Sequence, residues 1–212
     1  CYDRGLASAC GSPDLGADEW LSIFRQARAL GVGFILLAGG EPLTRPDVLA
    51  AAARVRDILF PVFTNGTLLD GERSAFFDAN RNLLPVVSIE GGERATDGRR
   101  GSGVYEKVLG AMDGLRRRNV PFGASVTVTK DNLPEVSGRP FVEALYARGA
   151  RAVVYVEYVP VGGTDDLAPG EAERRALDKA LFGLRASYPM LFLSFPGDEQ
   201  ALGGCLAGGR GF

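Results

Sequence analysis

The residues best suited to chemistry stand where an apolar run, Ile35-Leu36-Leu37-Ala38, ends abruptly at Gly39-Gly40-Glu41-Pro42. Two consecutive glycines leave the backbone bare, so a small ligand can approach its N–H and C=O groups closely. Pro42 cannot continue a strand ladder, and Glu41 places one charge beside the bare backbone. An ordinary turn has the same composition, but the position after a buried strand favours a ligand-binding loop.

Polar groups follow the other predicted strands as well. The strand ends read Thr64-Asn65-Gly66-Thr67, Ser88-Ile89-Glu90-Gly91, Thr127-Val128-Thr129-Lys130-Asp131-Asn132 and Glu157-Tyr158-Val159-Pro160-Val161-Gly162. The carboxyl ends of parallel strands meet at one edge of a sheet, so we expect these groups to surround one polar small molecule. Gly39 to Glu41 would meet its backbone-like groups, and Ser88 and Glu90 its hydroxyls.

Those residues require a sheet that positions them, and the sequence alternates between strand and helix patterns. The strands are too apolar for one solvated face, which indicates a parallel sheet covered by helices. The number of units predicts a partial, open barrel of the α/β class. Predicted strands cover residues 33–38, 60–63, 83–89, 122–129, 152–159 and 191–195; predicted helices begin at Asp18 and Pro46 and cover 68–79, 104–118, 141–148 and 171–187. The polar segment 93–103 is predicted to be a loop.

Composition excludes several kinds of chemistry. The 212 residues contain no histidine, which removes His-based triads and most zinc sites. The three cysteines, Cys1, Cys10 and Cys205, have no disulfide-like spacing, which indicates a reducing compartment and a cytoplasmic protein.

Charge and hydropathy limit the partners. The net charge is −2 and there is no long basic run, so we expect no nucleic-acid partner. No apolar stretch approaches the roughly 18 residues that span a bilayer, so we expect no membrane partner. The basic clusters Arg99-Arg100 and Arg116-Arg117-Arg118 flank predicted helix ends, where solvated cations are common.

Several segments together resemble the radical S-adenosylmethionine (SAM) enzymes. They are, in chain order, Cys1-Tyr2, Ala38-Gly39-Gly40-Glu41-Pro42, Phe63-Thr64-Asn65-Gly66-Thr67-Leu68-Leu69 and Val87-Ser88-Ile89-Glu90-Gly91. The resemblance covers nearly the whole chain and is closest to members with a SPASM or twitch extension, which a segment similar to residues 203–209 begins. It implies a (β/α)6-type open TIM-like barrel, lacking its first strand, over residues 1–195 and a truncated extension over residues 196–212.

The resemblance also implies roles for individual residues. Cys1 resembles the last of three cysteines in a Cys-x3-Cys-x2-Cys loop that binds a [4Fe–4S] cluster. Cys205 resembles a ligand of an auxiliary iron–sulfur cluster in the extension. The segment Gly39, Gly40, Glu41 and Pro42 corresponds to the one that receives the methionyl amino group. The resemblance implies that Ser88 and Glu90 bind the ribose hydroxyls. It implies further cofactor contacts at Asn65, Thr127 and Val161. No side chain is assigned a catalytic role.

The implied activity is reductive cleavage of SAM to a 5′-deoxyadenosyl radical, which abstracts hydrogen from a small-molecule or peptide substrate. The resemblance implies peptide or protein maturation or cofactor biosynthesis, with electrons from a reductant such as ferredoxin or flavodoxin. Cys10 lies nine residues after Cys1, which is not the family spacing, and there is no CxxC pair. The chain is therefore expected to be a fragment that holds no stable cluster by itself.

Two alternatives stay open at this point. One is a non-catalytic module of the same fold that has lost the cluster and binds a partner at the same edge. The other is an unrelated β/α-barrel enzyme in which Glu41, Glu90 and Glu157 hold Mg²⁺ or Mn²⁺.

Overall fold

A single parallel sheet organises the part of the chain that the computed structural model describes, residues 14–160 and 165–198. Its strand order follows the sequence, and each strand is hydrogen-bonded to the next in parallel. The strands are β1 (Phe60–Thr64), β2 (Leu83–Ser88), β3 (Gly123–Val128), β4 (Ala152–Glu157) and β5 (Leu191–Phe195). The predicted α/β class and open, partial barrel are confirmed.

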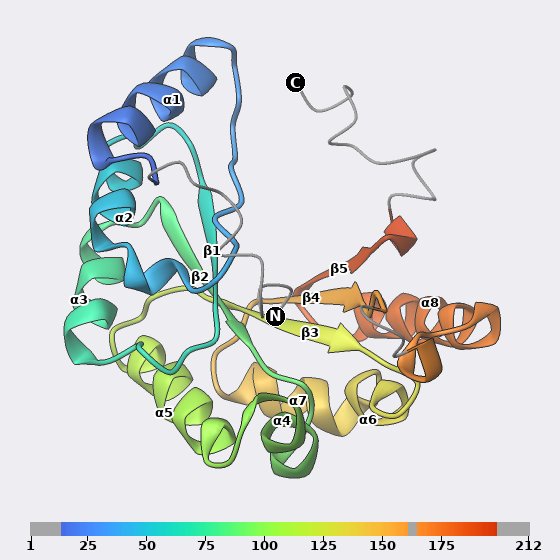
Figure 1. Ribbon diagram of the computed structural model, residues 1–212. Coiled ribbons are helices and arrows are strands. Elements are labelled where there is room, and N and C mark those ends of the chain that lie inside the picture. Colours follow the sequence, from blue (N-terminus) through green and yellow to red (C-terminus); the bar gives the residue numbers. More distant parts are fainter. Residues whose placement is uncertain (1–13, 161–164, 199–212) are drawn as a thin grey trace.

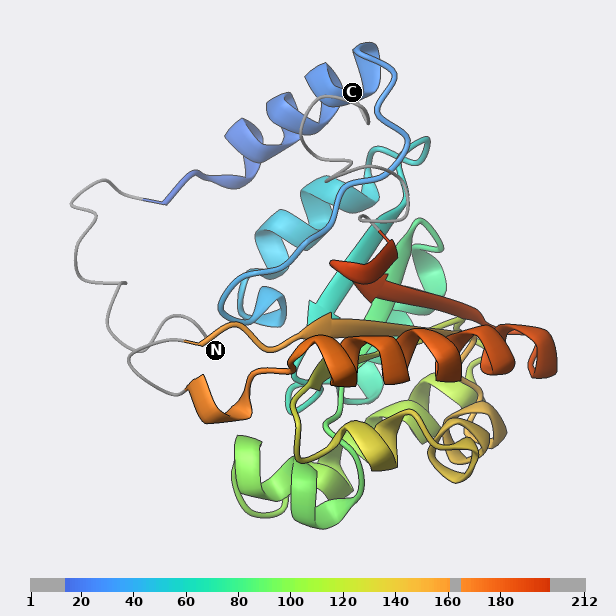
Figure 2. The ribbon, with the colours of Figure 1, turned by 90° about the vertical axis from the view of Figure 1, so that its right-hand side faces the viewer.

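The helices cover the outer face of this curved sheet (Figure 1). Turned by 90°, the same arrangement shows α8 running beside β4 and β5 (Figure 2). The helices are α1 (Ala17–Ala29), α2 (Pro46–Ala53), α3 (Gly71–Ala79), α4 (Glu93–Arg100), α5 (Val104–Arg117), α6 (Leu133–Val136), α7 (Arg139–Ala147) and α8 (Glu171–Ser187), with 3₁₀ turns η1 (Pro42–Thr44) and η2 (Asp165–Leu167). Among the described residues, no helix is both long and apolar enough to cross a membrane.

Aromatic side chains join the helices to the sheet. Phe24 of α1 is 1% exposed, and its ring centroid lies 5.0 Å from that of Phe60 and 5.5 Å from that of Trp20. Burying one such side chain removes a large apolar area from water, which is the main favourable term in folding. The α1–β1 contact therefore fixes the first helix against the sheet.

The opposite, inner face of the sheet is uncharged. Side chains alternate between the two faces of a strand, and register partners on neighbouring strands share a face. The inner-face positions are Pro61, Phe63, Leu84, Val86, Ser88, Gly123, Ser125, Thr127, Ala152, Val154, Val156, Leu191, Leu193 and Phe195. The only hydrogen-bonding side chains among them are Ser88, Ser125 and Thr127, on the two middle strands β2 and β3.

The predicted strand at residues 33–38 is only partly formed. Isolated parallel bridges join Phe34 to Leu59 and Leu37 to Val62. Ile35 N donates to Leu59 O at 3.0 Å and Leu37 N donates to Pro61 O at 2.8 Å. Pro61 has no N–H to return, so the ladder is interrupted. The segment nevertheless runs along β1 and delivers Gly39 to the carboxyl edge of the sheet.

The prediction of a loop at residues 93–103 is wrong over most of its length, because α4 occupies Glu93–Arg100. This helix buries only Thr96, so it leaves no apolar period in the sequence. The short helix α6 was also not predicted, and α3 begins at Gly71 rather than at residue 68, because Asp70 caps its first turn through Arg73 N at 2.9 Å.

Replacing Phe24 by Ala tests the α1–β1 contact. We expect the free energy of unfolding to fall by about 3–5 kcal/mol, because the change removes a fully buried ring and leaves a cavity. Phe182 of α8 is 80% exposed, so the same change there should alter stability by less than about 0.5 kcal/mol. Urea unfolding of both variants measures the difference, and equal losses would contradict the packing described.

Candidate functional site

The described site residues of the sequence analysis gather at the carboxyl edge of the sheet. Gly39 to Pro42 follow the segment beside β1, Asn65 follows β1, and Thr127 lies near the end of β3. Ser88 ends β2 and Glu90 follows it. Cys1, Val161 and Cys205 lie outside the described residues, so their expected roles stay predictions.

The Gly39-Gly40 backbone is open. Both residues are exposed, and a Cβ atom added at either would have nothing within 4 Å among the described residues. Gly39 has φ +124°, a conformation that L side chains rarely adopt. This backbone can therefore offer its polar groups to a ligand without a side chain in the way.

The Glu41 carboxylate is engaged within the protein. It accepts hydrogen bonds from Thr64 Oγ1 at 2.7 Å, from Asn65 N at 2.7 Å and from Leu43 N at 3.1 Å. The last of these caps η1, which Pro42 begins. Glu41 thus ties the double-glycine loop to the end of β1, and its charge is shared among three donors.

The Asn65 side chain shapes its own turn. Its Oδ1 atom accepts from Thr67 N at 2.9 Å and from Thr67 Oγ1 at 2.7 Å. Gly66 follows with φ +76°, and a Cβ there would come within 2.9 Å of Val87. The sequence Asn65-Gly66-Thr67 is therefore accounted for by local geometry, and the Asn65 backbone is held by Glu41.

Glu90 is the buried charge of the site. Its side chain is 1% exposed and pairs with Arg100, with Arg99 Nε 3.5 Å from Oε1. Oε2 accepts a hydrogen bond from Thr127 N at 3.0 Å. Each carboxylate oxygen thus already accepts from a group of the protein, and the expected contact of Glu90 with a ribose hydroxyl stays a prediction.

The expectation that Arg99 and Arg100 are solvated helix-end cations is wrong. Arg99 lies between Glu90 and Tyr158, with its guanidinium 5.2 Å from the Tyr158 ring centroid. Among the described residues, Arg100 Nε is a buried nitrogen that has no hydrogen-bond partner. The signal available in the sequence was their place in the polar segment directly after Glu90. Glu90 and Arg99 line one pocket with Arg94, Asp131 and Glu135, and Arg100 pairs with Glu90, so three guanidinium groups meet three carboxylates there. A guanidinium group can still donate hydrogen bonds to a carboxylate ligand.

Two hydroxyls face each other across β2 and β3. Ser88 and Ser125 are register partners on the inner face, and Ser125 is 9% exposed. Neither hydroxyl has a hydrogen-bond partner within the described part of the chain. Ser88 is only half-buried, and neither hydroxyl oxygen is among the buried, unpartnered atoms of the described residues, so both can bind water or a ligand. Ser125 was not predicted, because its only signal is a hydroxyl inside an apolar strand.

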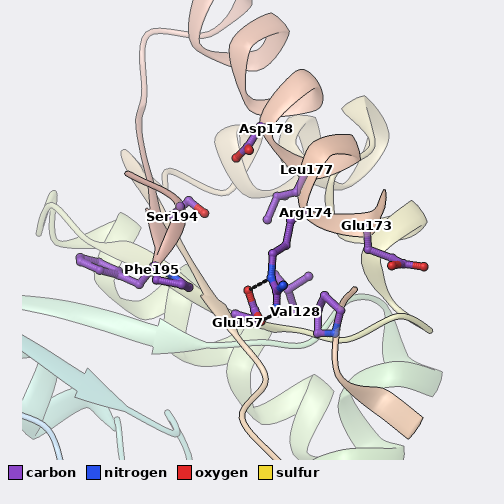
Figure 3. Close-up of a pocket in the computed structure, with 11 residues that line it drawn as sticks. Val128, Glu157, Glu173, Arg174, Leu177, Asp178, Ser194 and Phe195 are labelled. Carbon is purple, nitrogen blue, oxygen red and sulfur yellow. Dashed lines mark hydrogen bonds and ion pairs between the residues drawn. The ribbon is translucent and has the colours of Figure 1, made fainter. Parts of the chain in front are cut away.

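Glu157 belongs to a separate, small pocket between α8 and the ends of β4 and β5. Figure 3 shows its carboxylate meeting Arg174, and Arg174 Nε donates to Oε2 at 2.8 Å. This hydrogen bond raises the pKa of Arg174 above its usual value. Glu157 faces the helix side of the sheet, away from Ser88 and Ser125.

The proposed carboxylate metal site is not formed. Glu41, Glu90 and Glu157 are bound to different partners on different elements. Within residues 14–160 and 165–198, no group of three His, Cys, Asp or Glu side chains is arranged to hold a metal ion.

The glycines after Glu90 are required by a close neighbour. Gly91 has φ +131°, and a Cβ there would lie 2.7 Å from Glu135 Oε2 and 3.1 Å from Ala95 Cβ. Gly92 N donates to Glu135 Oε1 at 2.7 Å. The pair Gly91-Gly92 therefore allows a carboxylate from α6 to reach the start of α4.

Replacing Gly91 by Ala should lower the free energy of unfolding by about 1–3 kcal/mol, because the new Cβ forces both a strained φ and a clash. Gly98 lies within α4 and has open space where a Cβ would be added. Its replacement by Ala should raise stability by about 0.5–1 kcal/mol through helix propensity. Denaturant unfolding measures both changes, and a neutral Gly91→Ala would contradict the geometry.

Comparison with known proteins gives the same family as the sequence motifs. The radical SAM superfamily matches residues 9–145. An AdoMet-dependent heme synthase of Methanosarcina barkeri is 35% identical over 179 residues, which are 81% of this chain and 51% of that protein. The chain therefore spans about half the length of this curated relative.

Solved structures share the fold. Streptococcus suis SuiB bound to S-adenosylmethionine has a TM-score of 0.74 at 17% identity, over 88% of this chain and 45% of SuiB. The enzyme anSMEcpe with bound AdoMet and Cp18Cys peptide has a TM-score of 0.66 at 17% identity, over 86% of this chain and 58% of that one. The alternative of an unrelated metal-dependent barrel is overturned by the family match, which covers well over half of the chain. On this match, together with the parallel half-barrel and its loops, the protein belongs to the radical SAM superfamily.

Proposed function

We propose that this chain is the SAM-binding core of an enzyme that cleaves SAM reductively at a [4Fe–4S] cluster. When bound, the cluster and SAM supply the carbon–sulfur cleavage that yields a 5′-deoxyadenosyl radical for hydrogen abstraction. The protein's own residues bind and orient the cofactor and the substrate and enclose them. The whole enzyme's activity is part of this proposal, because the chain spans only half of its relative.

The observation that carries the proposal is that open backbone and guanidinium groups lie at one edge of the sheet. The amino acid part of SAM has an ammonium, which needs acceptors, and a carboxylate, which needs cations. The exposed Gly39-Gly40 backbone supplies carbonyl oxygens. Arg99 and Arg100 supply guanidinium donors beside Glu90. The residues present thus fit an amino acid moiety.

The nucleoside part of SAM fits the neighbouring strand ends. The hydroxyls of Ser88 and Ser125 lack partners within the described residues and can bind ribose oxygens. Asn65 and Thr127 lie at the same edge, and we retain both, with Val161, as further contacts. In this arrangement Glu41 acts on the cofactor through the loop that it fixes, not by direct contact.

For the iron–sulfur clusters the proposal rests on the family and on ligand chemistry. Thiolates are the ligands that iron–sulfur clusters take in proteins. We propose Cys1 as one ligand, with two further cysteines preceding it in the same polypeptide. We also propose that residues 196–212 begin a SPASM or twitch extension, in which Cys205 binds an auxiliary cluster.

The substrate proposed is a cofactor precursor, with a peptide as the second candidate. The 35% identity to a heme synthase favours the first over the second, since the peptide-bound anSMEcpe structure shares 17% identity. The uncharged inner face suits an apolar part of either substrate. The electron would come from ferredoxin or flavodoxin, in a reducing, cytoplasmic setting that keeps thiolates available.

The role of Glu90 is tested by Glu90→Gln, which removes its charge and keeps its shape. If Glu90 neutralises Arg99 and Arg100, the variant should bind SAM at least as tightly as the unmodified protein. It should also be less stable by about 3 kcal/mol, because a partly buried cation loses its partner. Calorimetric titration and urea unfolding measure the two effects. A SAM affinity about tenfold weaker would show instead that Glu90 contacts the ribose.

The proposed reaction is tested with the polypeptide that includes the residues before Cys1. After anaerobic reconstitution with iron and sulfide, dithionite and SAM should yield 5′-deoxyadenosine. Cys1→Ala should abolish the cluster absorbance and the product, because the remaining thiolates cannot hold the cluster. Cys10→Ala is the matched control and should retain both. A protein that binds SAM but forms no 5′-deoxyadenosine would be the non-catalytic module instead.

A further inference from the structure

The segment after β3 contacts the connection between β2 and α4 at two points. Asn132 Nδ2 donates to Glu90 O at 3.0 Å, and Glu135 Oε1 accepts from Gly92 N at 2.7 Å. The two contacts lie on either side of Gly91, in the turn that leads from β2 into α4. Asn132 ends the polar segment predicted after β3, whereas Glu135 was not predicted to belong to the site.

Glu135 is placed to define where α4 begins. Gly92, the N-cap of α4, has no side chain to cap the free N–H groups of the first turn. A carboxylate near a helix N-terminus satisfies an N–H and interacts favourably with the helix dipole. Since α4 buries only Thr96, polar contacts do most to fix its position. Glu135 shares this role with Thr96, whose hydroxyl accepts from Glu90 N at 3.2 Å and donates to Gly91 O at 3.1 Å.

The other end of α4 is fixed as well. Asp97 accepts hydrogen bonds from Gly103 N at 2.6 Å and from Tyr105 N at 2.8 Å, which join α4 to the start of α5. Arg99 and Arg100 follow Asp97 in the last turn of this eight-residue helix. The turn that Glu135 contacts and both arginines therefore belong to one short helix.

Asn132 holds the strand that leads into the same turn. Its side chain is 7% exposed, and Nδ2 donates also to Thr127 O at 2.9 Å. Its Oδ1 accepts from Thr129 N at 2.8 Å. The amide thus joins the ends of β2 and β3, directly beside the Thr127 N–H that binds the Glu90 carboxylate.

The segment that carries both residues is anchored to the sheet. Tyr155 of β4 is fully buried, and its hydroxyl donates to Val136 O at 2.9 Å. Burial raises the pKa of Tyr155 above its usual value, so the hydroxyl stays protonated and remains a donor at neutral pH. Glu135 is the neighbour of Val136 in α6. The Glu135 carboxylate is therefore held by a segment that is hydrogen-bonded to β4.

We propose that Glu135 and Asn132 are positioning residues, which set Arg99 and Arg100 of α4 for the carboxylate of SAM without touching it. The inference rests on the proposed function, because it assigns the arginines to that carboxylate. Its distinguishing feature is selectivity: the two residues act on the amino acid part of the ligand and not on its adenosine part.

The test compares two ligands. Methylthioadenosine shares the adenosine and sulfur of SAM but lacks the amino acid part, so it has no carboxylate for the arginines. In the reconstituted protein, Glu135→Gln should raise the dissociation constant of SAM about tenfold and that of methylthioadenosine less than about twofold. Glu143→Gln, the same change at an exposed carboxylate of α7, should alter neither.

Two further variants keep the proposal testable if Glu135→Gln folds poorly. Glu135→Asp retains the charge but shortens the reach to Gly92 N, and Asn132→Ala removes the bond to Glu90 O. Both variants should weaken the binding of SAM more than the binding of methylthioadenosine. The inference would be overturned if both ligands bound equally more weakly, or if the binding of SAM were unchanged. Failure of the unmodified protein to bind SAM would refute the proposed function instead, so the two failures are distinguishable.

Discussion

Burial of the Glu90 carboxylate is the constraint on which the rest of the site depends. A charge that is 1% exposed is tolerated only with partners, and here these are Arg99, Arg100 and the Thr127 N–H. Meeting that demand requires α4 to start directly after β2. It also requires Gly91 and Gly92, because Glu135 occupies the space where their side chains would be. The local sequence around Glu90 is thus explained largely by one ion pair and its supports.

Carboxylates in this half-barrel act chiefly as structural connectors. Glu41 joins the double-glycine loop to β1, Glu135 joins α6 to α4, and Glu157 joins β4 to α8. The contacts of Glu41 and Glu135 cross from one β/α unit to another, and that of Glu157 joins a strand to the helix that follows it. This leaves the groups offered to a ligand as backbone, hydroxyl and guanidinium, which matches a cofactor that carries both an ammonium and a carboxylate.

Apolar periodicity made most of the fold predictable. The helix Glu171–Ser187 and the strand Leu191–Phe195 have the predicted bounds, because one face of each is clearly apolar. Periodicity failed where polar contacts determine structure, as in α4, which is set by Glu135 and by its own terminal charges. It also could not reveal that Pro61 interrupts the ladder to residues 33–37. The motifs located the edge of the sheet correctly, but the partners of Glu41 and Glu90 depend on residues distant in sequence.

Strand order that follows chain order has an evolutionary consequence. Each loop at the carboxyl edge belongs to a separate β/α unit, so insertions in one loop leave the neighbouring units undisturbed. The loops next to the double glycine and Ser88 are constrained by cross-unit contacts, and Tyr158 and Leu167, which follow β4, contact Arg99 and Lys130 of the preceding units. Sequence change is therefore least costly at loop positions that make no such contact, and the connected positions preserve the geometry of the edge.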